Sequence, residues 1–236
     1  MQVTGKVVVI TGGASGIGEA LGRRFVAKGA RAMVLADRDG ARAQAEAARI
    51  GAHAAALDVV AEGAIEALVD AVEARHGPID LFCSNAGITA IGGAELADTD
   101  WQRVMDVNLM AHVRAARVLL PRMLARGGGY LLQTASAAGL LSQFDAPYAV
   151  SKHAAVAFAE WLSITYGERG IGVSCLCPGA VVTPLQQAES DRRRALLSQG
   201  LIDADAVADI VVEALARRRF LILTQDFVQT QLCSKV

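Results

Sequence analysis

The stretch Thr11-Gly12-Gly13-Ala14-Ser15-Gly16-Ile17-Gly18 lies between the apolar run KVVVIT at 6–11 and a segment, 16–28, whose apolar residues recur at helical spacing. Glycines in such a turn let backbone N–H groups approach an anion, because no Cβ stands in the way. The start of the helix adds a partial positive charge and unpaired N–H donors. A strand, a glycine turn and a helix in this order predict a cradle for the pyrophosphate of a dinucleotide.

Strand-like and helix-like segments alternate along the rest of the chain. The expected strands are 6–11, 31–37, 53–58, 79–84, 130–135, 172–177 and 220–223. The expected helices are 16–28, 41–50, 62–76, 98–126, 147–169 and 204–218. Such alternation, with near-continuous apolar strands, is typical of α/β proteins whose parallel sheet is covered by helices on both faces. The sequence contains no linker, low-complexity tract or repeat, so we expect residues 1–236 to form a single domain.

Charge and hydropathy exclude several classes of protein. The chain has 23 Lys and Arg against 24 Asp and Glu, so no basic excess indicates nucleic acid binding. No apolar run reaches the roughly 18 residues of a membrane span, and the N-terminus runs directly into a strand without a recognisable signal peptide. We therefore expect a cytoplasmic protein with neither a nucleic acid nor a membrane as partner.

The histidines and cysteines do not indicate a metal centre. The four histidines lack the spacing of metal ligands. Cys175 and Cys177 lie two apart in a strand-like run, so they share one face and could form a metal or redox pair. With no CxxC motif and no histidine nearby, we interpret them as small apolar residues of the core.

Asp37 ends the second expected strand, about 20 positions after Gly18. An acidic residue at this distance accepts hydrogen bonds from the adenine ribose hydroxyls. Asp37 could instead cap the following helix, and the neighbouring Arg38 could help to hold a phosphate. A carboxylate beside a 2′-phosphate is an unfavourable contact between like charges, so we expect NAD as the cofactor rather than NADP.

Tyr148 and Lys152 lie four positions apart at the start of the expected helix 147–169, so both side chains project from one helix face. A free tyrosine has a pKa near 10, and a cation within about 4–6 Å favours its phenolate. Lys152 can supply that charge, which makes Tyr148 a candidate general acid/base. Ser136, after the expected strand 130–135, could orient the same reacting oxygen. Tyr148 and Lys152 could also be a pair on a solvent-exposed helix surface, but the glycine turn upstream favours a catalytic role.

On these motifs, the sequence resembles the short-chain dehydrogenase/reductase family, of the compact type. The matching segments, in the family's order over about residues 5–185, are Thr11–Gly18, Asp58-Val59, Asn85-Ala86-Gly87, Asn108, Ser136, Tyr148-x-x-x-Lys152, and Pro178-Gly179 with Thr183. The resemblance implies a Rossmann-type, doubly wound parallel sheet of about seven strands. It also implies hydride transfer between NAD and a secondary alcohol or ketone, with the catalytic residues Ser136, Tyr148, Lys152 and Asn108.

The resemblance further implies a role for each cofactor-binding residue. Asp58 resembles the residue that binds the adenine amino group, and Asn85-Ala86-Gly87 the turn that lines the adenosine ribose. Lys152 resembles the residue that holds the nicotinamide ribose, and Asn108 the one that holds a water linking this lysine to solvent. The implied NAD-binding set is Gly12, Ser15, Gly16, Ile17, Gly18, Asp37, Asp58, Val59, Asn85, Ala86, Gly87, Tyr148, Lys152, Pro178, Gly179 and Thr183.

Three positions depart from the family pattern. Gln133-Thr134-Ala135 stands where the family often carries Asn-x-Ser, and Ser84 stands where a second asparagine often precedes the Asn-Ala-Gly turn. The gap between Ser136 and Tyr148 is one residue shorter than in many members. No catalytic group is lost, but the shorter gap is expected to reshape the substrate pocket.

The loop 137–147 is expected to border the substrate. Its candidate contacts are the apolar Leu140, Leu141 and Phe144 and the polar Gln143 and Asp145, with residues 89–93 as a rim. Because the loop has no arginine, we expect a neutral secondary alcohol or ketone as the small-molecule substrate. Residues 184–202 are expected to form a substrate lid. Within them, Arg192-Arg193-Arg194 either binds an anion, such as a phosphopantetheine group, or forms a solvated helix face.

The expected helices 98–126 and 147–169 are unusually apolar for surface helices, which favours burial against a second subunit. In the family such helices usually form a four-helix interface, so we expect a homodimer or a homotetramer. Two other functions stay open. The first is a 3-oxoacyl thioester reductase, which would explain the arginine run. Such biosynthetic reductases usually use NADPH, and Asp37 argues against NADPH as the cofactor. A non-catalytic NAD-binding sensor would not need the Ser136, Tyr148 and Lys152 set.

Overall fold

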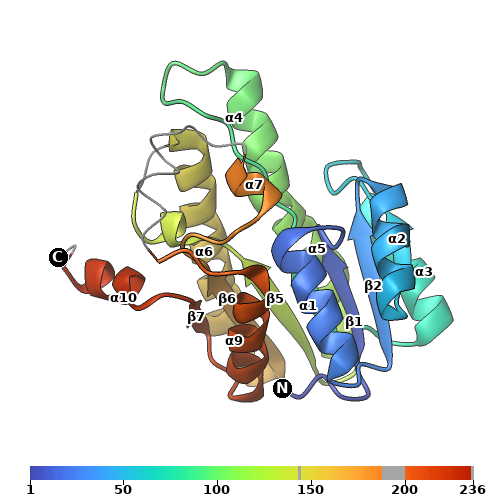
Figure 1. The fold of residues 1–236 in the computed structure, drawn as a ribbon. Helices are drawn as coiled ribbons and strands as arrows, with labels where there is room; N and C mark the ends of the chain where they lie inside the picture. The colour runs from blue at the N-terminus through green and yellow to red at the C-terminus, as the bar shows by residue number, and fades with distance from the viewer. Residues whose placement is uncertain (143–144, 188–199, 235–236) are drawn as a thin grey trace.

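The described residues form one seven-stranded parallel sheet in the order β3-β2-β1-β4-β5-β6-β7, which confirms the expected doubly wound α/β fold (Figure 1). The computed structural model describes residues 1–142, 145–187 and 200–234. The strands are β1 (Val7–Thr11), β2 (Ala32–Asp37), β3 (His53–Ala56), β4 (Leu81–Ser84), β5 (Gly129–Thr134), β6 (Ile171–Cys177) and β7 (Leu221–Leu223). Each expected strand is present, with ends that differ by one or two residues.

Helices cover both faces of this sheet. The α-helices are α1 (Gly16–Ala27), α2 (Gly40–Ile50), α3 (Ala64–His76), α4 (Asp98–Met105), α5 (Ala111–Ala125), α6 (Ala146–Tyr166), α7 (Pro184–Gln187), α9 (Ala204–Ala216) and α10 (Asp226–Cys233). A π-helical turn, η1 (Asp106–Met110), joins α4 to α5, and η2 (Ala137–Gly139) and η3 (Gly167–Arg169) are 3₁₀ turns. Helices α1, α2 and α9 pack on one face, and α3, α5 and α6 on the other.

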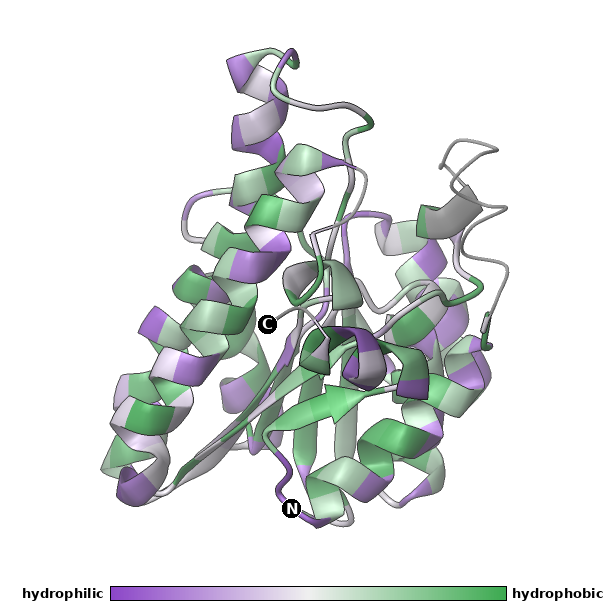
Figure 2. Cartoon of the chain, turned by 90° about the vertical axis from the view of Figure 1, so that its left-hand side faces the viewer, coloured by the Kyte–Doolittle hydropathy of each residue, from purple (hydrophilic) through white to green (hydrophobic). Residues whose placement is uncertain are grey.

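The strands explain why both faces are covered. In β1, Val7 and Val9 enter the core beneath α3, α5 and α6, whereas Val8 and Ile10 enter the core beneath α1 and α9. Successive side chains of a strand point to opposite faces, so an uninterrupted apolar strand has two faces to bury. Each fully buried aliphatic side chain stabilises the fold by about 1.5–3 kcal/mol. Figure 2 shows the hydrophobic strands in the middle of the molecule and helices with hydrophilic outer faces around them.

Two elements differ from the sequence prediction. The expected single helix 98–126 contains the π turn η1, which adds one residue to a turn without breaking the chain's helical course. Periodicity cannot reveal such an insertion, because the apolar pattern continues on both sides. Helix α10 was not predicted, since its sequence DFVQTQLC combines residues of low helix propensity with no clear apolar period. It extends from the body of the molecule and packs through Val228 against η2 (Figure 1).

The strand order places the site. The chain runs from β1 outward to β3 and then returns to β4 on the other side of β1. At this reversal the loops after β1 and β4 turn away from each other, which opens a crevice at the carboxyl ends of the strands. The glycine turn follows β1, and the Asn85-Ala86-Gly87 turn follows β4, so the two motifs border the same crevice.

Candidate active site

The glycine positions of the turn after β1 have no room for side chains. Gly12 and Gly16 adopt left-handed conformations, with φ of +66° and +53°. A Cβ on Gly18 would lie 2.0 Å from the carbonyl oxygen of Gly12, and a Cβ on Gly12 would lie 2.9 Å from the Cα of Ala86. The turn therefore packs against itself and against the β4 loop. The Gly13 and Ala14 N–H groups donate to Ala36 O and Asp37 Oδ2, whereas the N–H groups in the first turn of α1 have no partner within the helix and can bind an anion. This geometry fits a dinucleotide pyrophosphate.

Asn85 holds this turn in place. Its side-chain Nδ2 donates to the carbonyl oxygens of Thr11, at 3.2 Å, and Gly12, at 3.3 Å. In return, Thr11 Oγ1 accepts from the backbone N–H groups of Asn85, at 3.0 Å, and Ala86, at 3.2 Å. These reciprocal bonds join the loops after β1 and β4 across the switch point of the sheet.

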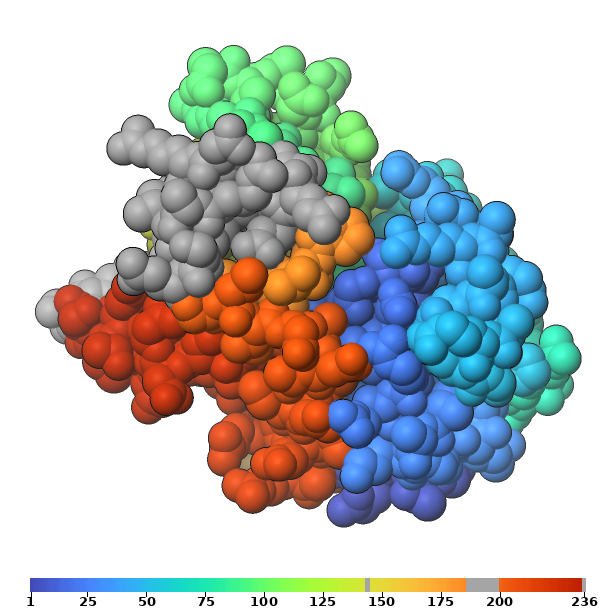
Figure 3. Space-filling view, in the orientation of Figure 1, coloured from blue at the N-terminus to red at the C-terminus, as the bar shows by residue number. Residues whose placement is uncertain are grey.

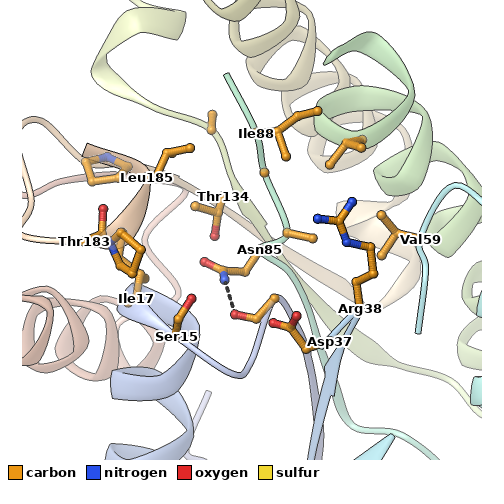
Figure 4. A pocket seen from close by; sticks show the side chains of 18 of the residues that line it. Ser15, Ile17, Asp37, Arg38, Val59, Asn85, Ile88, Thr134, Thr183 and Leu185 are labelled. Carbon is orange, nitrogen blue, oxygen red and sulfur yellow. Dashed lines mark hydrogen bonds between the residues drawn. The ribbon is translucent and has the colours of Figure 1, made fainter. Parts of the chain in front are cut away.

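Asp37 lies at the carboxyl end of β2 and lines the crevice. Its Oδ2 accepts from Ala14 N at 3.1 Å, and its Oδ1 accepts from Asp39 N at 3.0 Å. The helix-capping role belongs to Asp39, which accepts from Arg42 N at the start of α2. Figure 4 shows Asp37 and Arg38 on one side of the pocket and Ser15, Ile17 and Thr183 on the opposite side. Asp37 is therefore both a brace for the glycine turn and part of the pocket wall.

Tyr148 and Lys152 lie one turn apart on α6 and line the same crevice as the glycine turn. Both side chains are buried, and Lys152 Nζ lies 5.8 Å from the centre of the Tyr148 ring. The ammonium donates to the carbonyl oxygen of Thr134, at the end of β5, at 2.9 Å. Burial lowers the pKa of Lys152 to about 8. The lysine is thus held in place and is poised to change its charge near neutral pH.

Asn108 lies in the π turn η1 and does not line the pocket. Its Oδ1 accepts from Ile88 N at 2.9 Å, and its Nδ2 donates to Ile88 O at 2.9 Å and to Ser151 Oγ at 3.0 Å. Ser151 Oγ in turn donates to the carbonyl oxygen of Tyr148 at 2.8 Å. The side chain of Asn108 therefore joins the loop after β4 to the turn of α6 that carries Tyr148.

Three other predicted residues also lie outside the pocket lining. Ser136 starts η2 at the end of β5, and its Oγ accepts from Ala138 N at 3.1 Å. Gly18 is buried behind the glycine turn. Gly179 faces the C-terminal segment, because its N–H donates to Gln225 Oε1 at 2.9 Å. The predicted cofactor residues that do line the pocket are Gly12, Ser15, Gly16, Ile17, Asp37, Asp58, Val59, Asn85, Ala86, Gly87, Tyr148, Lys152, Pro178 and Thr183.

Sequence reasoning missed several lining residues. Arg38 was considered only as a possible phosphate ligand, and the others belong to no recognised motif. They are Leu57, Ile88, Val107, Thr134 and Ala135, whereas Pro184 and Leu185 begin the expected lid 184–202. Their common signal is position, because each stands within a few residues of a predicted site residue. They could have been predicted from their closeness in sequence to the motif residues, but not from their residue types.

The segment after Thr183 passes over the glycine turn. A Cβ on Gly16 would lie 3.0 Å from Thr183 Cγ2, and Pro184 and Leu185 line the pocket. The space-filling view shows residues near 184 against the N-terminal segments (Figure 3). At the other end of the expected lid, Ile202 forms a parallel bridge with Val181. Residues 188–199, with the arginine run 192–194, lie outside the described residues.

The expected substrate loop is partly used for internal packing. Leu141 is buried against Val228 of α10 and Ala137 of η2. Asp145 precedes α6, and its Oδ1 accepts from Gly92 N at 3.3 Å, which joins this loop to the rim at 89–93. Gln143 and Phe144 lie outside the described residues.

Comparison with known proteins accounts for this constellation of loops. The family model described as short chain dehydrogenase matches residues 6–194. The chain belongs to the short-chain dehydrogenase/reductase (SDR) family. Members of this family are oxidoreductases that act on hydroxyl or keto groups.

Several relatives match this SDR over nearly its full length. The 1-deoxy-11-beta-hydroxypentalenate dehydrogenase of Streptomyces avermitilis is 39% identical over 98% of this chain and 89% of its own. An SDR from Burkholderia phymatum, solved in complex with NAD, is 33% identical with a TM-score of 0.87, over 98% of this chain and 93% of its own. A 3-ketoacyl-(acyl-carrier-protein) reductase from Brucella melitensis, complexed with NADH, is 28% identical with a TM-score of 0.86, over 94% and 97%.

Among the described residues, no group of three or more His, Cys, Asp or Glu side chains could hold a metal ion. Over the same residues, no helix is both long and apolar enough to cross a membrane.

Proposed function

We propose that this SDR is an NAD-dependent oxidoreductase that interconverts a secondary alcohol and a ketone, with Tyr148 as general acid/base. The observation that carries the proposal is that Tyr148 and Lys152 line the crevice that also contains the glycine turn and Asp37. A dinucleotide bound along this crevice would extend from Asp37 to the tyrosine. Such a position brings the reacting end of the cofactor to the acid/base.

The chain offers a distinct group to each part of NAD. The glycine turn would hold the pyrophosphate through backbone N–H groups. The Asp37 carboxylate would accept from the adenine ribose hydroxyls and disfavour a 2′-phosphate, which supports NAD over NADP. Asp58 and Val59 would flank the adenine, and Lys152 would hold the nicotinamide ribose. When bound, the nicotinamide supplies or accepts the hydride.

Proton transfer falls to the protein side chains. In oxidation, the Tyr148 phenolate would remove the proton from the substrate hydroxyl as hydride leaves the carbon. In reduction, the phenol would return that proton to the carbonyl oxygen. The Lys152 ammonium favours the phenolate by its positive charge, and Ser136 Oγ would orient the substrate oxygen. Asn108 would support the pair through its hydrogen bonds to Ile88 and Ser151.

The pocket favours a substrate with an apolar framework. Ile88, Val107 and Leu185 give the crevice apolar walls. The Streptomyces avermitilis relative is named for the dehydrogenation of a hydroxylated compound, which agrees with oxidation of a hydroxyl group. We therefore place a neutral secondary alcohol, or the matching ketone, in this pocket.

A 3-oxoacyl thioester reductase is the second candidate. The Brucella melitensis relative is named a 3-ketoacyl-(acyl-carrier-protein) reductase, and it was solved with NADH. An NADH-linked reductase would be compatible with Asp37, so this candidate differs from the first in substrate rather than in cofactor.

Exposed apolar side chains on α6 support a homo-oligomer. Trp161 is 50% exposed, and Ile164 is 76% exposed. Both lie on the long helix whose sequence favours a subunit interface. Burial of such a stripe against a second copy would remove it from water. We propose a homodimer or homotetramer formed through α6 and the α4–α5 helix.

A substrate screen tests the proposed reaction. The protein would be mixed with NAD or NADP and with sets of secondary alcohols, sterols and hydroxyacyl thioesters, and formation of the reduced nicotinamide would be followed by absorbance. We expect turnover with NAD and an apolar secondary alcohol. Turnover confined to hydroxyacyl thioesters would favour the second candidate. NAD binding at micromolar concentration, with no turnover in any set, would indicate a sensor and contradict the proposal.

A further inference from the structure

A row of polar side chains lies inside the core, on the sheet face that α5 and α6 cover. Ser84 ends β4 and stands opposite Gln133 of β5 in the strand register, and Gln133 stands opposite Cys175 of β6. Phe82 and Leu131, two residues earlier on their strands, enter the core beneath α5 and α6. Because strand side chains alternate between faces, Ser84 and Gln133 point into the same core.

His112 enters this core from the opposite layer. It lies on α5, which packs against β4, β5 and β6. The residue is 1% exposed, and Gln133 is fully buried. Five buried polar atoms have no hydrogen-bond partner among the described residues: Ser84 Oγ, both polar atoms of the Gln133 amide and both ring nitrogens of His112. A buried polar group without a partner destabilises the folded state, so five such atoms in one core require an explanation.

His112 and the end of β5 that carries Gln133 lie near Lys152. Its ammonium lies close enough to His112 to lower the pKa of the imidazole, which burial already reduces, to about 3. Lys152 Nζ donates to the carbonyl oxygen of Thr134, which follows Gln133 on β5, and Gln133 is the register partner of Cys175 on β6. His112 and the β5 end of the polar row therefore lie near Lys152, and none of Ser84, His112 and Gln133 lines the pocket.

Other groups also face Lys152. A Cβ on Gly87 would lie 3.4 Å from Lys152 Nζ and 3.5 Å from Asn108 Oδ1. Gly87 therefore lies between the lysine ammonium and the asparagine side chain. The groups that face the ammonium are the Tyr148 ring of α6, the Thr134 carbonyl of β5, Cys175 and Cys177 of β6, His112 of α5 and Asn108 of η1. None of these groups is a carboxylate.

We propose that Ser84, His112 and Gln133 form an internal water site that positions Lys152 and keeps its ammonium charged. Water fits the site chemically, since a hydroxyl, an amide and a neutral imidazole together offer both donors and acceptors. A cation would be repelled by the ammonium. The relevance to catalysis rests on the proposed function, in which the charged Lys152 favours the Tyr148 phenolate. The three residues are positioning residues, because they act through Lys152.

The site would act in one direction on Lys152. Burial alone disfavours the ammonium and lowers the lysine pKa. Water oxygens, held by the amide and the hydroxyl, stabilise the charged form and counter part of that shift. Replacing the polar groups by apolar ones should therefore lower the Lys152 pKa further. The imidazole adds no competing charge, because it stays neutral above about pH 3.

Lysine titration by NMR tests the proposal without a substrate. The chain has four lysines, so a protein labelled with ¹³C at the lysine ε-carbon gives a simple spectrum, and Lys152→Met identifies the Lys152 signal. Burial without water lowers the Lys152 pKa to about 8, so we expect a higher Lys152 pKa in the hydrated wild type. In Gln133→Leu and in His112→Leu, the Lys152 pKa should fall from the wild-type value toward about 8 or below. Gln133→Asn keeps the amide and should restore most of the wild-type value.

Leu131→Val is the matched control, since it loses core packing on the same face of β5 but no polar atom. It should leave the Lys152 titration unchanged. If either apolar variant fails to fold, Ser84→Ala provides the same comparison with a smaller change in volume. A Lys152 pKa that stays at the wild-type value in all the apolar variants would overturn the water site.

A different experimental result would contradict the proposed function without contradicting the water site. If Lys152→Met retained near-wild-type turnover, the lysine would have no catalytic role. The NMR shifts in the apolar variants would still establish the water site. If Lys152 is catalytic, the high-pH limit of kcat should move to lower pH in Gln133→Leu and not in Leu131→Val.

Discussion

At the scale of single residues, the sequence motifs identified residues that line the pocket, whereas the pKa values of the buried groups depend on the folded structure. Tyr148, Lys152 and Asp37 were predicted from residue type and spacing, and all three line one crevice. The lowered pKa of Lys152 and the isolation of His112 could not be predicted, because both depend on residues far away in the sequence. Ser84 and Gln133 stood out as departures from the family pattern, and they are register partners.

His112 should make the fold sensitive to acid. Its folded pKa of about 3 lies below the ordinary value of 6.5, so the unfolded chain binds more protons between these values. Stability is therefore lost as the pH falls through this window, by about 2 kcal/mol between pH 6.5 and 5. Urea unfolding at both pH values should show this loss in the wild type and a smaller loss in His112→Leu. Equal losses in the two proteins would contradict a buried neutral imidazole.

Asp37 should set the choice of cofactor. Asp37→Asn keeps one acceptor oxygen, which can serve only one of the two N–H groups of Ala14 and Asp39, and it removes the charge that repels a 2′-phosphate. The preference of kcat/KM for NAD over NADP should fall about tenfold or more, which corresponds to about 1.4 kcal/mol. If discrimination between the two cofactors is unchanged, a different residue reads the ribose.

At the scale of elements, the segments were predictable, but their contacts were not. Strand and helix positions followed from apolar periodicity, because each strand buries both faces and each helix only one. The π turn η1 escaped prediction, and so did the fact that its Asn108 side chain braces α6 rather than lining the pocket. Such a role depends on which elements meet in space. In the same way, η2 meets α6 at Gly139, where a Cβ would lie 2.6 Å from the carbonyl oxygen of Lys152.

Gly139→Ala should therefore disturb catalysis through α6. The added methyl group must push η2 away from the turn that carries Lys152, so we expect a kcat at least tenfold lower and a reduced melting temperature. Gly167→Ala is the matched control, because a Cβ there meets nothing within 4 Å and its φ of −57° is helical. That variant should keep full activity and gain up to about 1 kcal/mol of stability. Equal effects of the two substitutions would contradict the close contact.

At the scale of the whole molecule, strand order was the part that periodicity left open. Alternation of strands and helices predicted a parallel sheet, and the family resemblance implied seven strands, but which strands are neighbours depends on contacts between distant segments. The exposed side chains of α6 raise the same issue for assembly, since they are apolar and the described part of the chain leaves them exposed. A second copy would cover them.

Ile164→Asp should therefore weaken self-association. A charge at this position would be buried without a partner in the proposed interface, which strongly disfavours assembly. Sedimentation velocity should show an oligomer for the wild type and a shift toward monomer for the variant. Leu201→Asp also replaces an exposed leucine, away from α6, and should sediment like the wild type. A wild type that is monomeric at high concentration would exclude the proposed interface.

Turnover by Tyr148→Phe is the most direct test of the central claim, which is proton transfer by a tyrosine beside a buried ammonium. Removal of the phenol oxygen leaves the ring and the rest of the crevice in place, so NAD affinity should stay within about twofold of the wild type. With the best alcohol from the screen, kcat should fall roughly 10²–10⁴-fold, the usual contribution of a general acid/base. A Tyr148→Phe enzyme that retains half of the wild-type kcat would contradict the account.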